Sequence, residues 1–318
     1  MAMQFPEPWL TVIMPTHQGA HWIDASLGSL VEQGAEGIEL LVLDSSSAPD
    51  TLAEIGRYSN RLRIRVLNPG KRVMWHAKTN LGVQEAQSDY VCWLHQDDLW
   101  LPGRSAAVHQ WIDADPDAAL HLSNSLIVDS AGRPVGNWKC PFDSEGTLCP
   151  NLLLERLLVQ NFVAAPAPVY RRDAYLAVGG LDETLWYTAD WDLWLKLQAA
   201  GQVCFHPEVT AAFRIHSSSL TVSGSRNAAE FREQMQIVLE RHLPRLETRT
   251  GSVRRVGNAS IEVNTALAAA SGGDLTHLGS AVRALLALRP SDWVRFLRDS
   301  RLVDRLVPRL RARLLGAF

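Results

Sequence analysis

The sequence predicts an α/β protein with a mainly parallel, Rossmann-like sheet, and three observations lead to that class. Strand, short polar loop and helix repeat three times between residues 9 and 94, which predicts right-handed βαβ units. Apolar residues make up 47% of the chain and charged residues 20%, which are ordinary values for a globular protein. The length of 318 residues suits one large α/β domain with an appendage, or two domains.

The first four strands are short apolar runs, each followed by polar residues. We expect them at Trp9–Met14, Ile38–Leu43, Leu62–Leu67 and Tyr90–Leu94. Between them, His21–Gln33 and Val73–Gln87 have helical periodicity, and Ala48-Pro49-Asp50-Thr51 opens another helix. Ligands of parallel sheets bind beyond the carboxyl ends of the strands. The turn Pro15–Gly19, Asp44 and the pair Asp97-Asp98 all fall at that edge.

The second half of the chain adds strands and helices less regularly. Strands are predicted at Ala119–Ile127 and Cys204–Phe213, and helices at Leu152–Val159 and from about Asp190. Val163–Tyr170 is a strand that Pro166 and Pro168 confine to an edge or to an irregular ledge. Trp138–Asn151 is irregular and polar, which is typical of a surface loop over a site.

Composition excludes several classes of protein. The net charge of −3 argues against a general nucleic-acid binder. No segment reaches the roughly 20 apolar residues that cross a bilayer, and Met1–Trp9 has no signal-peptide pattern. The four cysteines form no C-x-x-C pair, so we expect reduced thiols in a cytoplasmic protein, with Cys92 and Cys204 in the core. The glycine motifs of dehydrogenases and P-loop NTPases are also missing.

The pair Asp97-Asp98 at the end of a buried strand is the strongest chemical feature. Two adjacent carboxylates repel each other and lose hydration, which is costly unless a cation neutralises them. Mg²⁺ and Mn²⁺ prefer such oxygen ligands and often share them with substrate phosphates. The alternative is a helix N-terminus, where Asp97 would cap the first turn.

Two further side chains have two interpretations each. Asp190 lies among tryptophan and tyrosine residues at the start of a helix, where it could be a general base or an N-cap. His216 follows the last strand, where it could be a metal ligand or a hydrogen-bonded surface residue.

The motifs, taken in order, resemble those of the inverting family 2 glycosyltransferases, which have the GT-A fold, over roughly Trp9 to Thr221. The motifs that carry the resemblance are Pro15-Thr16, Asp44 with its serine cluster, Lys78-x-Asn80-x-Gly82, Gln96-Asp97-Asp98-x-Trp100-x-Pro102, Gly179-Gly180-Leu181-Asp182 and Ala189-Asp190-x-Asp192-Leu193-Trp194. The form Gln-Asp-Asp-x-Trp is similar to that of bacterial members that build O-antigen, capsule and other surface glycans.

The resemblance implies a role for each site residue. Pro15, Thr16 and Asp44 would contact the nucleoside, with Lys78 near the base or diphosphate and Asp97 at the ribose or donor sugar. Asp98 and His216 would ligate a Mn²⁺ or Mg²⁺ ion at the diphosphate, and Asp190 would be the catalytic base. The implied partners are a nucleotide-diphosphate sugar and a glycan or lipid-linked acceptor.

Some positions depart from the family pattern. Many relatives have Asp where His95 stands and Glu where Ala189 stands, so the site is expected to be tuned differently. The Q-x-x-R-W motif of processive synthases is absent, which favours an enzyme that adds a single sugar. Trp138–Asn151 and the surroundings of Asn161–Tyr170 are the expected acceptor-binding segments.

The composition changes after Ser223, which predicts a catalytic domain at 1–223 and a helical region at 224–318. Helices are expected at Asn227–His242, in two runs within Asn258–Leu288, at Ser291–Val307 and at Arg309–Leu315. From Arg295 to Phe318 seven arginines face two aspartates. A basic amphipathic tail predicts peripheral attachment to the inner face of the cell membrane, and the alternative is packing on the catalytic domain or in a homodimer.

Two other functions compete with glycosyl transfer. A nucleotidylyltransferase uses a similar sheet, but it should carry an arginine in the glycine-rich loop after the first strand, and Pro15–Gly19 has none. A non-catalytic protein of the same fold would bind a nucleotide sugar or glycan without turnover. The sequence leaves the sugar, the base, the acceptor and the oligomeric state open.

Overall fold

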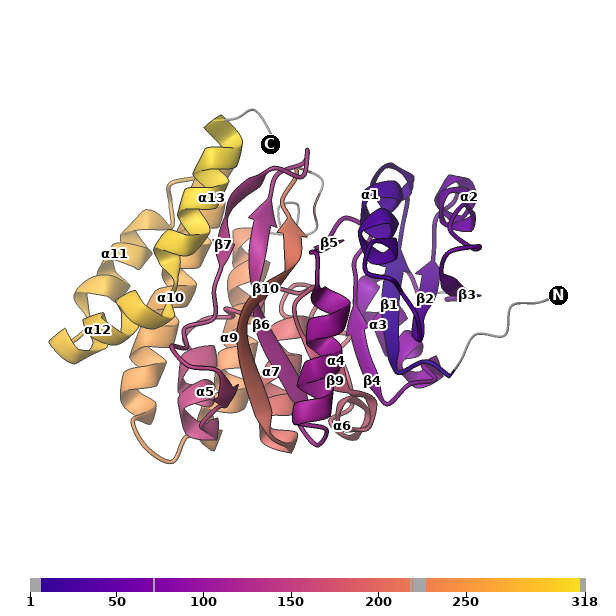
Figure 1. Ribbon diagram of the computed structural model, residues 1–318. Coiled ribbons are helices and arrows are strands. Elements are labelled where there is room, and N and C mark those ends of the chain that lie inside the picture. Colours follow the sequence, from indigo (N-terminus) through magenta and orange to yellow (C-terminus); the bar gives the residue numbers. More distant parts are fainter. Residues whose placement is uncertain (1–6, 71, 218, 220–226, 315–318) are drawn as a thin grey trace.

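The computed structural model describes residues 7–70, 72–217, 219 and 227–314. In this part of the chain, ten strands form one sheet, and its main path is β3-β2-β1-β4-β9-β6-β10-β5. Helices pack on both faces of the sheet, and a group of helices from the C-terminal region extends the molecule at one end (Figure 1). The α/β fold class is therefore confirmed.

The first four strands are the parallel part of the sheet. They are β1 (Leu10–Thr16), β2 (Ile38–Asp44), β3 (Arg63–Leu67) and β4 (Tyr90–Trp93), connected by α1 (Ala20–Val31), α2 (Asp50–Gly56) and α3 (Trp75–Glu85). The pairs β1–β2, β1–β4 and β2–β3 are all parallel. Thr16 is the register partner of Asp44, so the last residues of β1 and β2 lie side by side.

The other half of the sheet is mixed, with both parallel and antiparallel strand pairs. The strands there are β5 (Leu99–Trp100), β6 (Leu120–Val128), β7 (Pro134–Trp138), β8 (Gly146–Thr147), β9 (Val169–Arg171) and β10 (Val203–Arg214). β9 is antiparallel to both β4 and β6, whereas β6 and β10 are parallel. Because proline has no N–H for the ladder, Pro166 and Pro168 leave only Val169–Arg171 in the strand.

Several elements were not predicted by hydrophobic periodicity. α4 (Arg104–Ala114) and α6 (Arg172–Ala177) begin among basic residues, and β5, β7 and β8 are too short or too polar to show an apolar run. The helices expected at Leu152–Val159 and from Asp190 are present as α5 (Pro150–Leu157) and α7 (Ala189–Ala200).

Alternate residues of the strands face two hydrophobic cores. In β1, Val12 packs with residues of α1, α2 and α4, while Ile13 packs with residues of α3, α5 and α7. All four cysteines are free, and Cys92 and Cys204 are buried as predicted. In the described part of the chain, no helix combines the length and apolar character needed to cross a membrane.

The C-terminal region is helical, as expected. It contains α9 (Ala228–His242), the 3₁₀ turn Leu243–Arg245, α10 (Thr250–Ser271), α11 (Leu278–Leu286), α12 (Pro290–Asp299) and α13 (Leu302–Leu314). Residues of α9 and α10 belong to the same hydrophobic cluster as α5 and α7. The proposed boundary at 223/224 lies outside the described residues, so the division into two domains stays a prediction.

The last helix packs on the sheet. The guanidinium of Arg311 donates to the carbonyl of Val135 in β7 at 3.3 Å. Gly136 lies so close to α13 that an added Cβ would be 2.4 Å from Pro308. Of the two arrangements expected for the C-terminal tail, α13 therefore has the second: it packs on the predicted catalytic domain and its sheet. Helices α11 and α12 lie farther out (Figure 1).

Candidate functional site

The ends of β1 and β2 form the first part of the candidate site. The Thr16 hydroxyl donates to Asp44 Oδ1 at 2.9 Å, and the Ser46 hydroxyl donates to the same oxygen at 2.7 Å. Lys78 extends from α3 to this edge, where Nζ donates to the Thr16 carbonyl and to the Ser45 hydroxyl, both at 2.7 Å. The predicted nucleoside-binding residues Pro15, Thr16, Asp44 and Lys78 are thus brought together.

Lys78 is a buried cation at this edge. Its side chain is 1% exposed, and burial lowers its pKa to about 8, although Asp44 partly opposes this shift. The ammonium therefore stays mostly charged at neutral pH. A desolvated cation with strong donors is a good partner for an anionic or polar ligand at the strand ends.

The turn after β1 is connected to the loop that carries the acidic pair. The amide of Gln96 accepts from the His17 backbone N–H at 2.9 Å and donates to the His17 carbonyl at 3.2 Å. Gly19 allows this approach, because an added Cβ would lie 2.2 Å from the Gln96 amide oxygen. The nucleoside-binding edge and the acidic loop are therefore held in fixed relation.

Asp98 is a buried carboxylate with one oxygen available. Its Oδ1 accepts the backbone N–H of Arg214 at 2.9 Å, whereas Oδ2 has no hydrogen-bond partner and lies 3.6 Å from Nδ1 of His95. Burial raises the pKa of Asp98 to about 6. A buried oxygen without a partner fits a cation that prefers oxygen ligands. The helix that follows has Gly103 at its N-cap, so the capping interpretation of the acidic pair was wrong.

Asp97 has a different environment from its neighbour. Its Oδ2 is 2.8 Å from Nε2 of His216, and its carbonyl accepts from Nε of Arg214 at 2.7 Å. Burial alone would raise the pKa of Asp97, but His216 and His95 lower it. His216 is therefore bound to Asp97 rather than to Asp98, although both predicted metal ligands belong to the same group of residues.

Asp190 lies in the first turn of α7, after Thr188 at the N-cap position. Its Oδ1 accepts the backbone N–H of Trp191 at 2.7 Å, and its Oδ2 accepts from the amide of Asn161 at 3.1 Å. Burial raises the pKa of Asp190 to about 6, against the opposing effect of these two donors. The N-cap interpretation was wrong, because Thr188 occupies that position.

His95 connects the acidic pair with Asp190. Burial by itself would lower the pKa of His95, but the negative charges of Asp98, Asp97 and Asp190 together raise it. Nδ1 of His95 lies 3.6 Å from Asp98 Oδ2, and the effects of Asp97 and Asp190 place them within electrostatic range of the imidazole. The ring also lies at 5.4 Å from Trp75 and at 6.2 Å from Trp93.

Trp22, Arg214 and His95 were not predicted to be part of the site, and Asn161 was expected only at the start of an acceptor-binding segment. Trp22 of α1 packs on the His216 ring, with 4.6 Å between the two ring centroids. The Arg214 guanidinium lies 5.1 Å from the centroid of the Trp22 ring. Asn161 holds Asp190, and His95 joins the carboxylates. The sequence noted His95 only as a departure from the family pattern, and no spacing rule connects Trp22 or Asn161 with residues so distant in the chain.

Asn80 of the Lys78-x-Asn80 motif has a structural role. Its amide donates to the carbonyl of Leu181 and accepts the Leu181 backbone N–H, both at 2.9 Å. The turn there needs Gly180, which has a φ of +65° and close contacts with Asn80 and Tyr175. These bonds fix the start of the segment that leads to Asp190.

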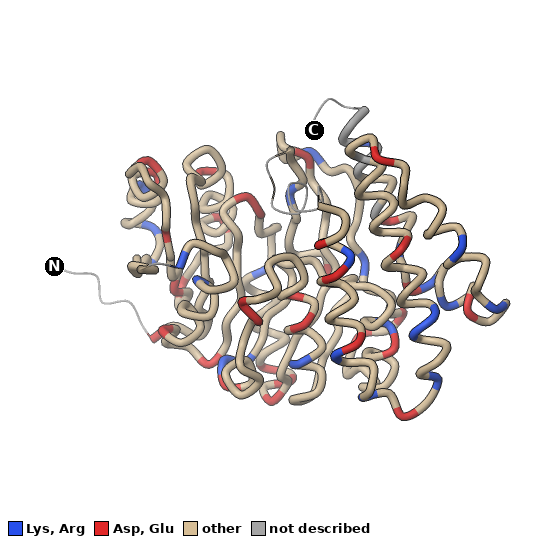
Figure 2. The backbone as a smooth tube through the Cα atoms, turned by 180° about the vertical axis from the view of Figure 1, so that it is seen from behind, with Lys and Arg blue, Asp and Glu red and all other residues tan. Residues whose placement is uncertain are grey.

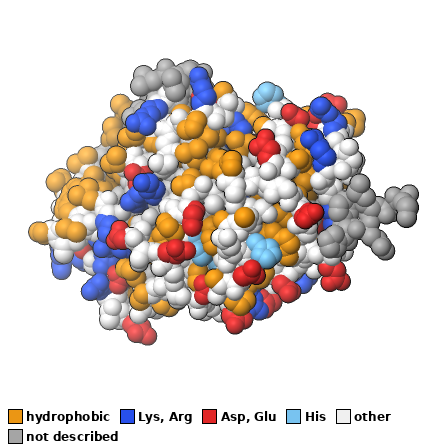
Figure 3. Space-filling view, viewed as in Figure 1, with side chains coloured by type: hydrophobic (Ala, Val, Ile, Leu, Met, Phe, Trp, Pro, Cys, Tyr) orange, Lys and Arg blue, Asp and Glu red, His pale blue; other side chains and the backbone are white. Residues whose placement is uncertain are grey.

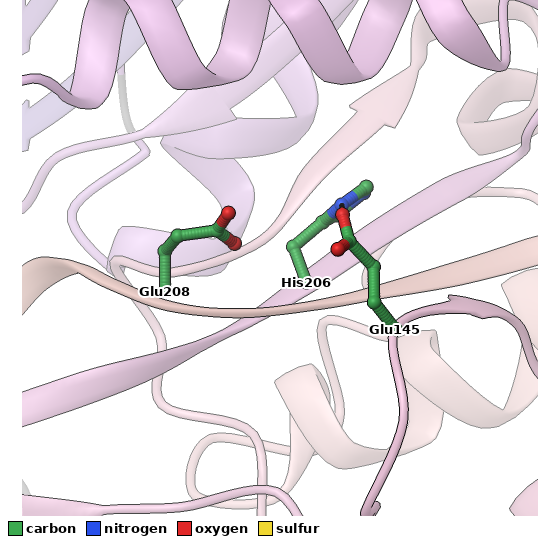
Figure 4. A group of neighbouring side chains, drawn as sticks. All are labelled: Glu145, His206 and Glu208. Atoms are coloured by element: carbon green, nitrogen blue, oxygen red, sulfur yellow. Dashed lines mark hydrogen bonds and ion pairs between the residues drawn. The ribbon is translucent and has the colours of Figure 1, made fainter.

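A second group of potential metal ligands lies elsewhere. Among the described residues, Glu145, His206 and Glu208 are the three side chains whose ligand atoms all lie within 4.8 Å of one another (Figure 4). His206 pairs in register with Ser123, whereas Arg214 at the other end of β10 pairs with Val128 and bonds to Asp98. This group is therefore separate from the predicted donor site.

Comparisons with known proteins agree with this geometry. A family model described as glycosyl transferase family 2 matches residues 11–144. An uncharacterized glycosyltransferase of Rickettsia typhi is 23% identical over 237 residues, which is 70% of this chain and 69% of the relative. An uncharacterized glycosyltransferase of Haemophilus influenzae is 21% identical, covering 66% and 67% of the two chains.

Solved structures show the same fold. Residues 1–349 of S. aureus TarS in complex with UDP-GlcNAc match with a TM-score of 0.65 and 16% identity, over 91% of this chain and 79% of that one. The chain spans only 42% of a longer TarS structure. The mannosyltransferase PcManGT of Pyrobaculum calidifontis, in complex with GDP-Man and Mn²⁺, matches with a TM-score of 0.57 and 19% identity, over 96% and 88% of the two chains.

Proposed function

We propose that the chain is a family 2 glycosyltransferase and that it is a metal-dependent, inverting enzyme. It transfers a sugar from a nucleotide-diphosphate donor to a hydroxyl of a glycan or lipid-linked acceptor, in the synthesis of a cell-surface polysaccharide. The observation that carries the proposal is the position of His95, whose Nδ1 lies 3.6 Å from Asp98 Oδ2 and whose pKa is raised by Asp98, Asp97 and Asp190 together. An acidic pair and a separate carboxylate within electrostatic range of one imidazole would supply both halves of the chemistry.

In this proposal the donor lies along the carboxyl ends of β1, β2 and β4. Pro15, Thr16 and Asp44 contact the nucleoside, and Lys78 supplies positive charge near the base or the diphosphate. Asp97 contacts the ribose or the donor sugar. The complexes of TarS with UDP-GlcNAc and of PcManGT with GDP-Man support a donor of this class.

Asp98 and His216 are the residues that would hold the divalent ion. The Asp98 oxygen without a hydrogen-bond partner fits a hard cation such as Mn²⁺ or Mg²⁺, and the PcManGT complex contains Mn²⁺. When bound, the ion neutralises the charge that develops on the departing diphosphate. Asp97 orients the His216 ring through Nε2.

Asp190 is the proposed catalytic base. It accepts the proton of the acceptor hydroxyl, whose oxygen attacks the anomeric carbon from the face opposite the diphosphate and inverts the configuration. A carboxylate with a pKa of about 6 is ionised at neutral pH and is more basic than an exposed one. Asn161 and the Trp191 backbone N–H orient its two oxygens.

The enzyme would work in the cytoplasm, at the inner face of the cell membrane where lipid-linked acceptors are found.

The donor is tested by a thermal-shift panel of UDP-, GDP- and dTDP-sugars, with and without Mn²⁺. One nucleotide that stabilises the protein only together with the metal supports the proposal. Stabilisation that is the same without metal, and unchanged in Asp98→Asn, would contradict the metal site.

Catalysis is tested separately with Asp190→Asn, which keeps the shape of the side chain but removes the base. We expect donor binding to persist while transfer is lost. Unchanged turnover would contradict the role of Asp190, and a wild-type protein that binds the donor without transferring sugar would favour a binding protein of the same fold.

A further inference from the structure

Helix α11 carries an apolar surface that is only partly buried. Ala281 and Leu288 are buried against α10, in a cluster that also includes Leu285. Beside this buried stripe, the exposed residues Leu275, Leu278, Val282 and Leu286 follow one another at intervals of three or four residues, with exposed fractions of 61%, 42%, 53% and 78%. The apolar stripe of a helix is normally covered along its whole width.

The next helix extends this exposed apolar surface. In α12, Phe296 is buried, while Trp293, Val294 and Leu297 are exposed by 37%, 67% and 69%. Of the sixteen large hydrophobic residues exposed in the described part of the chain, eight lie between Leu275 and Val303. Figure 3 shows hydrophobic side chains gathered over the end of the molecule where α11 and α12 lie. We call the seven exposed residues of Leu275–Leu286 and Trp293–Leu297 the α11–α12 face.

The exposed charges beside this face are mainly positive. Residues 272–300, which include the face, contain four arginines and three aspartates, without lysine or glutamate, and Arg295 is paired with Glu155. Two of the aspartates, Asp292 and Asp299, are buried and bound to arginines. Arg283 and Arg289 are exposed beside the apolar residues, and Figure 2 shows basic positions spread along these helices.

We propose that the α11–α12 face binds the anionic lipid surface of a membrane. Leucine, valine and tryptophan side chains would enter the headgroup region, while the flanking arginines contact lipid phosphates. The positive charge favours lipid over a second copy of the chain, because a two-fold contact through this face would bring two sets of arginines together. The proposal rests on the proposed function in one respect: binding to the membrane would bring the enzyme to a lipid-linked acceptor.

The test is sedimentation of the full chain with vesicles of phosphatidylcholine, with and without 30% phosphatidylglycerol. We expect binding to the anionic vesicles, weakened at least tenfold by 0.5 M salt or by the variant Leu286→Asp/Leu297→Asp. The matched control is Ile237→Asp, which changes an exposed hydrophobic residue of α9 and should bind like the wild type. Arg283→Gln/Arg289→Gln should also reduce binding severalfold.

The other outcomes decide against the proposal. Equal binding to neutral and anionic vesicles, or no binding of the wild type, would overturn it. A wild type that is dimeric in solution, and that Leu286→Asp/Leu297→Asp makes monomeric, would assign the face to a homodimer instead. Unchanged donor-induced thermal stabilisation shows that the variants are folded. Since Asp190→Asn should still bind vesicles, failure of docking and failure of catalysis are distinguished.

Discussion

Asp190 and Asp192 lie two residues apart in α7, and their environments are opposite. Asp192 is buried and bound by two cations, Arg241 at 2.9 Å and Lys196 at 3.1 Å, and by His242 at 2.8 Å. Burial would raise the pKa of Asp192, but these partners lower it well below its usual range. Asp190 has only neutral donors in contact, and burial raises its pKa to about 6.

The comparison distinguishes a carboxylate that stabilises the fold, Asp192, from one that remains basic enough to take part in catalysis, Asp190. The charge of Asp192 is neutralised within the protein, so it joins α7 to α9 and has no remaining affinity for a proton near neutral pH. The charge of Asp190 is only solvated by two N–H groups, so the carboxylate keeps basicity that a substrate can use. The pair Asp97 and Asp98 shows the same division, because His216 and His95 lower the pKa of Asp97, whereas burial raises that of Asp98 to about 6.

The largest expected effect is on catalysis. Asp190→Asn should lower kcat by about 10³-fold or more, because a general base contributes roughly 10² to 10⁴ in rate. Donor affinity, measured by calorimetry, should change less than threefold. The matched control is Asp192→Asn, whose folded fraction should keep most of its turnover. Equal losses of kcat in both variants would remove the distinction between the two carboxylates.

The second effect is on stability. Asp192→Asn should lower the free energy of unfolding by about 3 kcal/mol, because Arg241, His242 and Lys196 lose their common anionic partner. Urea titration at pH 7 measures this change. Arg241 also binds Asp182 at 2.8 Å, so Asp182→Asn, at a partly exposed position, is the control and should cost less than about 1 kcal/mol. An Asp192 variant as stable as the wild type would show that these contacts contribute nothing.

A smaller effect is expected at the acidic pair. Asp98→Asn should weaken Mn²⁺ binding in the presence of donor by at least tenfold, because an amide oxygen carries no net charge. Metal titration by thermal shift measures the loss. Glu208→Gln, in the separate Glu145, His206 and Glu208 group, is the control and should leave donor-linked metal binding unchanged. The reverse result would move the functional metal to that group.

Local patterns were enough to predict the parallel half of the fold. The apolar runs of β1 to β4 and the polar residues that follow them fix both the strand direction and the binding edge. The mixed half was not predictable from such patterns. β9 is placed between β4 and β6 by prolines and by packing, and β5, β7 and β8 have no hydrophobic period of their own.

The same limit explains what was missed in the site. Residues that carry motifs, such as Asp98 and Asp190, could be selected from their sequence neighbours. Asn161, Trp22 and His95 gain their importance from contacts with residues distant in the chain. The contrast between Asp190 and Asp192 is also tertiary, because Arg241 and His242 come from another helix.

The pH dependence of the rate sharpens the assignment of Asp190. Its pKa of about 6 predicts that transfer increases as the pH rises through 6, since only the ionised form accepts a proton. At saturating donor and Mn²⁺, the rate at pH 5 should be about one tenth of the rate at pH 7. In Asn161→Ala, which loses a donor to the carboxylate, the midpoint should move upward. A flat profile between pH 5 and 7 would contradict Asp190 as the base.

The smallest expected effect is a pH-dependent change in the free energy of unfolding, which tests the contrast between Asp190 and Asp192 without an activity assay. The folded-state pKa of Asp190 is about 6, above the ordinary value of about 4, so the folded protein binds more protons between these limits. Its contribution to stability is therefore present below pH 4 and is lost as the pH rises to 6, whereas that of Asp192 is present above pH 4 and lost in acid. Asp190→Asn should consequently gain about 1 kcal/mol at pH 7 and almost nothing at pH 4, a modest value because Asp190 is partly exposed. Urea titrations at both pH values measure the difference, and a loss of stability at pH 7 would show that Asp190, like Asp192, is held mainly for structure.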